Sequence, residues 1–300
     1  MRHRADDLVT CFLAPRVFIM CTLALRRSKS HGEPGTQGSG DRLCGMGQHE
    51  LLIRLSAWVE NSGRALELRT ARTFRGGPSL RQLNQSVAYE DGVTKQQREG
   101  DVLAVLRYLV DQLAVSIDLA VECKAAKDYP WVAFYDEQRV VPEIGELWFL
   151  PAGDWRADAL ADLASEWREA PALSTDRVAT HAVSAFGKDG KNFAHDAAQQ
   201  AMSFARARAA VNYRYVGDPD NLTLAKAVVP VVVTQAPLFT CELTSDGQVL
   251  LSPAERFDVW LHSSREGRRR VYVRSETAVA HMADDLSAIC QRLNRSIGGS

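Results

Sequence analysis

The stretch VSIDLAVECK, residues 115–124, decides the fold that the sequence predicts. The apolar run at 117–121 has the length of a buried strand, and it ends abruptly in Glu122, Cys123 and Lys124. Side chains on a strand alternate between its two faces, so we expect Glu122 and Lys124 to point the same way. A buried strand that ends in a carboxylate and an ammonium on one face requires a chemical explanation.

The bulk composition permits a sizeable core. The chain has 300 residues, of which 46% are hydrophobic, and this length suggests one or two domains. Charge is nearly balanced, with 36 Lys and Arg residues against 37 Asp and Glu residues. The balance argues against a protein that is basic over its whole surface, but it is compatible with a local basic groove for phosphates.

Cysteine usage gives an expectation about the compartment. The six cysteines are scattered, and none forms a CxxC pair, so neither a structural zinc site nor a redox motif is indicated. Isolated cysteines fit a reducing cytosol better than a secreted disulfide scaffold. We therefore expect a cytoplasmic protein.

Residues 1–46 differ in composition from the rest of the chain. An apolar segment at 8–25 contains Pro15 and Arg16, and a polar, glycine-rich segment follows it at 26–42. We interpret 1–46 as a disordered or wrongly assigned extension, and an interfacial or membrane segment is the alternative. No other stretch approaches the roughly 20 apolar residues of a membrane span, so we predict no firm membrane association.

The body, residues 47–300, is predicted to be a single α/β domain with a mixed sheet. A helical pattern runs from 49 to 74 with a break at 61–63, and short polar linkers then suggest an antiparallel meander of three strands. The predicted strands of this meander lie at 86–89, 101–110 and 115–123. A long segment at about 130–190 reads as an insertion, with a helix at 155–167 inside it.

The second half of the body adds further elements. An alanine-rich helix is predicted at 192–211, followed by one β-branched strand at 227–243 with Pro230 near its start. The C-terminal additions are two strands, at 257–262 and 269–275, and a closing helix at 276–293. The basic run at 265–275 is either a phosphate-binding segment or a solvated hairpin.

Asp101 makes the end of the 115–124 strand chemically interesting. It opens the preceding predicted strand, so if the two strands are neighbours, Asp101, Glu122 and Lys124 meet at one rim of the sheet. Two carboxylates there form a pocket of oxygen ligands that suits Mg²⁺. An adjacent ammonium can orient a water or neutralise charge on a phosphate. Hydrolysis of a phosphodiester needs this combination.

Asp101 followed by Glu122-Cys123-Lys124 resembles the D…(D/E)xK signature of the PD-(D/E)XK nuclease superfamily. The resemblance covers roughly Leu51 to Leu243 and includes the order of a restriction-endonuclease-like core, namely helix, three strands, helix, strand. It is nearest to restriction-endonuclease-like proteins of the type IV (Mrr-like) kind. Glu67 matches an acidic position on the family's first core helix.

The resemblance implies a nuclease that uses Mg²⁺ or Mn²⁺ to hydrolyse DNA phosphodiesters. Asp101 and Glu122 would hold the ion with the Cys123 carbonyl as a further ligand, Lys124 would position the attacking water, and Glu67 would complete the shell through water. DNA is the expected partner, and a homodimer or a partner in a defence complex would be compatible. Two departures are that Gly100, and not Pro or an aliphatic residue, precedes the Asp, and that about 65 residues separate the third strand from the second helix.

Two other interpretations stay open. One is a catalytically silent nuclease-like module that binds nucleic acid within a larger complex. The other is a protein in which the Glu-x-Lys pattern is a coincidence. Asp118 is a poor rival for Asp101, because it lies four residues from Glu122 along one strand, roughly 13 Å away.

Overall fold

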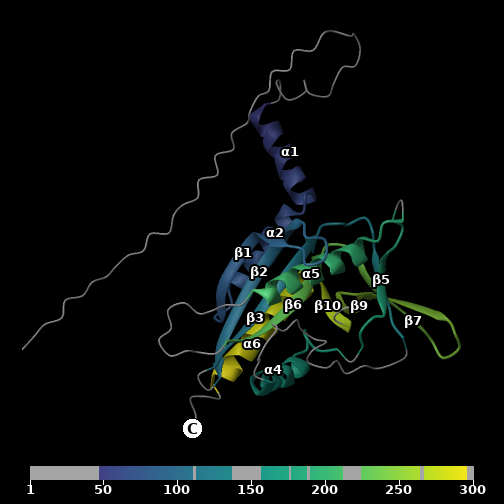
Figure 1. The fold of residues 1–300 in the computed structure, drawn as a ribbon. Helices are drawn as coiled ribbons and strands as arrows, with labels where there is room; N and C mark the ends of the chain where they lie inside the picture. Colours follow the sequence, from purple (N-terminus) through teal and green to yellow (C-terminus); the bar gives the residue numbers. More distant parts are fainter. Residues whose placement is uncertain are drawn as a thin grey trace, which may run out of the picture. The chain divides into compact units, whose positions relative to one another are not determined.

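A six-stranded mixed sheet is the centre of the fold (Figure 1). The computed structural model describes residues 47–110, 113–136, 157–175, 177–187, 190–211, 224–263 and 267–295. In spatial order the strands are β1 (Leu80–Glu90), β2 (Gln97–Val110), β3 (Leu113–Lys124), β6 (Leu224–Thr234), β10 (Gly267–Ser275) and β9 (Arg256–Ser263). β1, β2 and β3 are successively antiparallel, β6 is parallel to β3 and to β10, and β9 is antiparallel to β10. The predicted meander and the mixed sheet are confirmed.

The turn between β1 and β2 is built by an aspartate. The Asp91 carboxylate accepts hydrogen bonds from the backbone N–H groups of Val93 and Thr94, at 2.9 and 3.0 Å. Aspartate is favoured in turns because its side chain can satisfy backbone donors two or three residues further along. This turn lets β1 reach back along nearly the whole of β2, so β1 is longer than the predicted strand at 86–89.

Helices cover both faces of the sheet. The described helices are α1 (Gln48–Asn61), α2 (Arg64–Arg75), α4 (Ala157–Glu169), α5 (Phe193–Ala210) and α6 (Glu276–Arg295). Alternate residues of β3 and β6 divide between two buried clusters, one shared with α2, α4 and α6 and the other shared with α5. Small alanine side chains on the buried face of α5 allow it to lie close to the sheet, and the Asn192 side chain caps its first turn.

A second, four-stranded sheet lies beside the first. Its order is β5 (His181–Ser184), β4 (Trp131–Phe134), β7 (Leu238–Leu243) and β8 (Val249–Ala254). The parallel pair β3–β6 continues directly into the parallel pair β4–β7. Backbone bonds bridge the bend, from Gln235 N to the Lys124 carbonyl at 3.1 Å and from Trp131 N to the Pro237 carbonyl at 2.8 Å. Backbone hydrogen bonds therefore hold the chain in place both at the end of β3 and at the start of β4.

The predicted single strand at 227–243 is wrong. The chain bends after Thr234, whose side-chain oxygen accepts a hydrogen bond from Ala236 N at 3.0 Å, and β7 starts in the other sheet at Leu238. Pro230 lies in the interior of β6 and not near the start of a strand. A proline is tolerated there because β10 begins to pair with β6 only at the next residue, Val231.

The described residues from Gln48 onward belong to one compact unit. The strands β4 and β5 of the second sheet and the helix α4 fall within the segment predicted as an insertion at about 130–190. Residues 137–156 of that segment lie outside the described residues, as does the extension at 1–46. None of the helices in the described ranges has the length and apolar character needed to cross a membrane.

Candidate active site

Asp101 and Glu122 lie next to each other on neighbouring strands. Val102 pairs with Val121, so the same register one residue further places Asp101 opposite Glu122. Residues directly opposite in an antiparallel pair have Cβ atoms about 5 Å apart. The Asp101 carboxylate also accepts a hydrogen bond from the backbone N–H of Cys123 at 2.6 Å. The structure thus brings together the two carboxylates that the sequence analysis placed at one rim of the sheet.

Lys124 contacts Glu122 directly. Its Nζ atom lies 2.6 Å from Glu122 Oε1, so the two side chains do share a face of β3. The Glu122 side chain is only 7% exposed and that of Lys124 is 30% exposed. This pair is therefore not a solvated ion pair at an exposed strand end, in which the attraction between the charges would be weak.

Glu67 approaches the same cluster from α2. A Cβ atom placed on Gly63, the residue before α2, would lie 3.9 Å from the Cβ of Ala125, so α2 begins against the residue that follows Lys124. Glu67 is mostly buried in the first turn of α2, and its charge contributes to the raised pKa of both Asp101 and Glu122. Glu67 is therefore part of one electrostatic cluster with the two strand carboxylates.

The cluster contains more negative charge than its cations neutralise. Burial, followed by the neighbouring Glu122 carboxylate, raises the pKa of Asp101 to about 7. Burial also raises the pKa of Glu122, although Lys124 opposes this rise. Mutually repelling carboxylates with raised pKa values are common at functional sites, because a purely structural role gives no reason to bury them together.

Cys123 separates the two motif residues and points away from them. Its Sγ lies 3.8 Å from the Thr70 hydroxyl oxygen in the buried cluster beneath α2. Burial, with added repulsion from Asp101, raises the pKa of the thiol well above its usual value. The side chain is thus a protonated core group, and only its backbone carbonyl is chemically suited to the predicted role as a metal ligand.

Two neighbours of the cluster carry no motif signal. Tyr89 on β1 pairs with Arg98 on β2. The Glu122 charge raises the pKa of Tyr89, and the Arg98 charge opposes the rise in the pKa of Glu122. Burial, with Glu122 as the next cause, raises the pKa of Tyr89 to about 12, so its phenol stays neutral. The sequence signal for these two residues was the β1–β2 hairpin pattern, which identifies them as partners once the register of the two strands is known.

Packing against α5 explains why residue 100 is a glycine. Tyr89 stacks on Phe204 of α5, with ring centroids 5.1 Å apart, and a Cβ atom on Gly100 would lie 2.4 Å from the Phe204 ring. Only glycine fits beside this ring. Gly100, the residue before Asp101, thus lets α5 pack closely against β2.

A cavity of about 500 Å³ opens between the β1–β2 turn and α5. Arg98, Gln199 and Gln200 line it, together with Asp91, whose carboxylate lies 3.2 Å from Arg98. A cavity of this size accommodates a nucleotide-sized group, and Arg98 connects it electrostatically with Glu122.

The donors at the site suit a hard divalent cation. Among the described residues, no group of three or more His, Cys, Asp or Glu side chains is arranged to hold a metal ion. Asp101 and Glu122 nevertheless supply two carboxylates whose pKa values are raised by burial and, for Asp101, by repulsion from Glu122, and Mg²⁺ or Mn²⁺ would offset this repulsion. Asp118 lies elsewhere, where Arg208 binds it at 2.7 Å and Ser116 at 2.5 Å.

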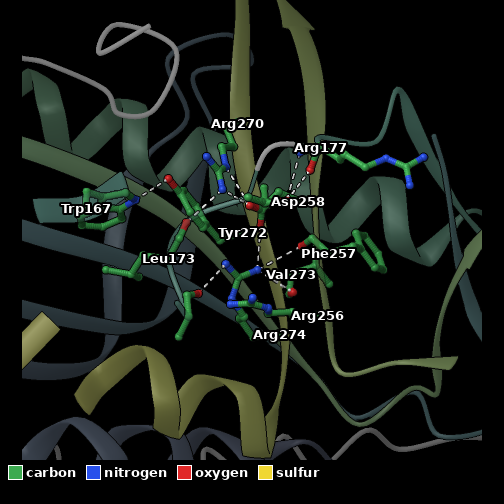
Figure 2. A network of polar contacts seen from close by, with 12 residues as sticks. Trp167, Leu173, Arg177, Arg256, Phe257, Asp258, Arg270, Tyr272, Val273 and Arg274 are labelled. Carbon is green, nitrogen blue, oxygen red and sulfur yellow. Dashed lines mark hydrogen bonds and ion pairs between the residues drawn. The ribbon is translucent and has the colours of Figure 1, made fainter. Parts of the chain in front are cut away.

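A second buried carboxylate, Asp258 on β9, has a very different environment (Figure 2). Arg270 and Arg274 of β10 both donate to it, with contacts at 2.8 and 2.6 Å. Although burial by itself would raise the pKa of Asp258, the two guanidinium groups hold it below its usual value. Figure 2 also shows Trp167 donating to the Tyr272 hydroxyl, at 3.0 Å.

The Asp258 network corrects the interpretation of two arginines in the basic run at 265–275, whereas Arg268 and Arg269 of the same run are half-buried. Arg270 and Arg274 are 2% and 1% exposed, so they are neither a phosphate-binding surface nor part of a solvated hairpin. The Nη2 atoms of Arg270 and Arg274 also donate to the backbone carbonyls of Leu173 and Ala172, respectively. This network joins β9 and β10 to the segment that follows α4.

No protein-family model, curated protein or solved structure matches this chain. The fold that the structure establishes is α/β, with a mixed six-stranded sheet and a second sheet. Any finer assignment therefore depends on the chain's own residues and their geometry.

Proposed function

We propose that this protein is a metal-dependent nuclease that hydrolyses DNA phosphodiester bonds and has a restriction-endonuclease-like core. The observation that carries the proposal is the placement of a buried carboxylate, Glu122, opposite the partly buried carboxylate of Asp101, with Lys124 alongside. The order of the elements also supports it, because α2, the β1–β2–β3 meander, α5 and the parallel strand β6 follow the helix, three strands, helix, strand pattern.

In this proposal Asp101, Glu122 and the Cys123 carbonyl hold Mg²⁺ or Mn²⁺. When bound, the ion supplies a Lewis acid that stabilises charge on a phosphate and acidifies a water ligand. Glu67, mostly buried on α2 beside the strand carboxylates, completes the ligand shell through water. The buried position of Glu122 limits the competing water and strengthens its electrostatic effect.

Lys124 acts on the nucleophile or on the transition state. Its ammonium is held 2.6 Å from Glu122 and its side chain is 30% exposed, so it can reach both the carboxylates and an incoming phosphate. A cation at this place can orient a water for in-line attack and can stabilise the charge that develops on the pentavalent phosphorus. Neutral Tyr89, close to Glu122, adds no charge that would oppose the substrate.

A nucleic-acid-binding module without cleavage is the second candidate. One observation favours it, namely that no group of three ligating side chains is arranged for a metal among the residues that the structure describes. The repelling pair of the partly buried Asp101 and the buried Glu122 favours the enzyme, because such a pair lowers stability unless it is used for metal chemistry.

The test is cleavage of supercoiled, linear and single-stranded DNA in Mg²⁺, Mn²⁺ or EDTA. We expect metal-dependent cutting by the wild type, a loss of about 10³-fold or more for Glu122→Gln, and about 10²–10³-fold for Lys124→Ala. Matched controls are Glu90→Gln and Lys95→Ala, which alter an exposed ion pair of 3.6 Å next to the β1–β2 turn. These two variants should cut like the wild type.

Each other outcome has a defined meaning. Salt-dependent DNA binding without cutting in any metal would favour the second candidate. Neither cutting nor binding would contradict both. Equal losses in the motif variants and in the two surface controls would show that the effect is not specific to the cluster.

A further inference from the structure

We propose that Arg64 and Lys124 together form a subsite for a backbone phosphate of the DNA strand, next to Asp101 and Glu122. This inference rests on the proposed nuclease function and adds a residue that the motif does not contain. Arg64 is the first residue of α2, and Lys124 is the last residue of β3. The two cations therefore come from different elements that meet at the same rim of the sheet.

The packing of α2 places Arg64 at this rim. Because Gly63 lies against Ala125, the first turn of α2 is directly beside the end of β3. Gly63 has a left-handed φ of 84°, a conformation in which a larger residue would be strained, and this permits the close approach. Arg64 follows at once, so the packing of Gly63 against Ala125 places it beside the end of β3.

Polar contacts with three side chains orient the guanidinium group of Arg64. Its Nη1 atom lies 2.7 Å from Glu67, 3.2 Å from Glu99 and 3.4 Å from the Ser86 hydroxyl. All three contacts use the same nitrogen, so Nε and Nη2 can still donate. An arginine that is held by one nitrogen keeps donors in the planar arrangement that binds two phosphate oxygens at once.

Arg64 is accessible as well as oriented. Its side chain is 51% exposed, compared with 11% for that of Glu67. A phosphate that approaches Asp101 and Glu122 is repelled by their charge, and Arg64 and Lys124 are cations on the two elements that border them. The subsite contributes to binding because it partly compensates this repulsion where the phosphate enters.

A purely structural role is the competing explanation, because Arg64 also joins α2 to β2 through Glu99. Arg69 provides the matched comparison on the same helix. It makes the same kind of bridge, to Glu276 at 2.6 Å and to Glu60 at 3.1 Å, and its side chain is 41% exposed. If bridging alone mattered, the loss of either arginine should have the same consequence.

The experiment measures DNA binding and cleavage for Arg64→Ala, Arg64→Lys and Arg69→Ala. Binding of a fluorescent DNA duplex is followed by anisotropy at several salt concentrations in Ca²⁺, another cation that takes oxygen ligands. Cleavage of the same duplex is followed in Mg²⁺ to separate KM from kcat. Thermal melting of all three variants checks that each is folded.

We expect Arg64→Ala to weaken binding about 5- to 20-fold, chiefly through KM, and to reduce the slope of log K against log salt by about 0.9. Arg64→Lys should restore the slope but only part of the affinity, because an ammonium cannot bind two oxygens in the same planar manner. Arg69→Ala should stay within about twofold of the wild type in both measurements.

The inference and the proposed function can fail separately. If the wild type cuts DNA, Lys124→Ala strongly reduces cutting, and Arg64→Ala retains wild-type affinity and slope, only the Arg64 inference is overturned. The same holds if Arg64→Ala and Arg69→Ala lose affinity equally. If the wild type neither binds nor cuts DNA, the proposed function is overturned and the subsite with it.

Discussion

Two carboxylate centres on the same sheet, the buried Asp258 and the partly buried Asp101, differ in how their charge is compensated. Asp258 has two arginines within hydrogen-bonding distance, and its pKa is held low although it is completely buried. Asp101 has a backbone N–H as its hydrogen-bond donor and a second carboxylate opposite, and its pKa rises to about 7. Burial alone therefore does not mark a functional carboxylate. Burial without sufficient compensating charge does.

The largest expected effect is on the compensated centre. Asp258→Asn should lower the free energy of unfolding by about 3–5 kcal/mol, because it leaves Arg270 and Arg274 buried without a counter-ion. Urea denaturation at neutral pH measures this loss. The same chemical change at the other centre, Glu122→Gln, should alter the free energy of unfolding by about 1 kcal/mol or less, since it also removes repulsion from Asp101.

This contrast would fail if the two substitutions had equal effects. A loss below about 1 kcal/mol for Asp258→Asn would show that the buried arginines do not depend on their carboxylate.

An intermediate effect with an unusual pH dependence is expected at Asp101. Its pKa in the folded protein, about 7, lies above the usual value of 3.8, so the folded state retains a proton that the unfolded chain releases. The resulting stability is present below the unfolded value and is lost as the pH rises through about 7. Asp101→Asn should therefore be more stable than the wild type at about pH 8, by roughly 2–4 kcal/mol, and equal to it at about pH 4.

Urea denaturation in EDTA across this pH range tests the sign of the difference. Adding Mg²⁺ at about pH 8 should stabilise the wild type more than Asp101→Asn, because the variant lacks one of the proposed ligands. A variant that is less stable than the wild type at this pH would contradict the view that the Asp101 charge is under-compensated.

The smallest effect is expected at the border of the compensated centre. Arg177 lies 2.5 Å from Glu242, but both side chains are about one-third exposed, at 34% and 32%. Arg177→Gln should lower the free energy of unfolding by about 0.5 kcal/mol, and added salt should remove the difference. A loss comparable to that of Asp258→Asn would mean that Arg177 belongs to the buried network of Figure 2 and not to its border.

The parts of the site that depend on local rules were predictable. Strand alternation placed Glu122 and Lys124 on one face, and the short linkers between strands placed Asp101 beside them. Tyr89 and Arg98 could not be assigned in the same way, because their approach to Glu122 depends on the register and twist of three strands.

The fold shows the same limit. The meander, α5 and the closing helix follow hydrophobic periodicity, which is a local signal. The second sheet joins the four-residue strand β4 to β7, more than 100 residues later, and a strand of four residues is too short for periodicity to identify. Within the basic run, Arg270 and Arg274 were misread because nothing local indicates that they have a buried acidic partner on β9.

The bend at which the strand pair β3–β6 continues into the pair β4–β7 has a consequence for how this protein can be engineered. The second sheet is not formed by one continuous segment of the chain, since one of its central strands precedes α5 and the other follows β6. Deleting the segment between β3 and α5 would remove β4 and β5 and leave β7 without its parallel partner. Engineering or recombination that swaps this region must therefore exchange two separated gene segments together, or neither.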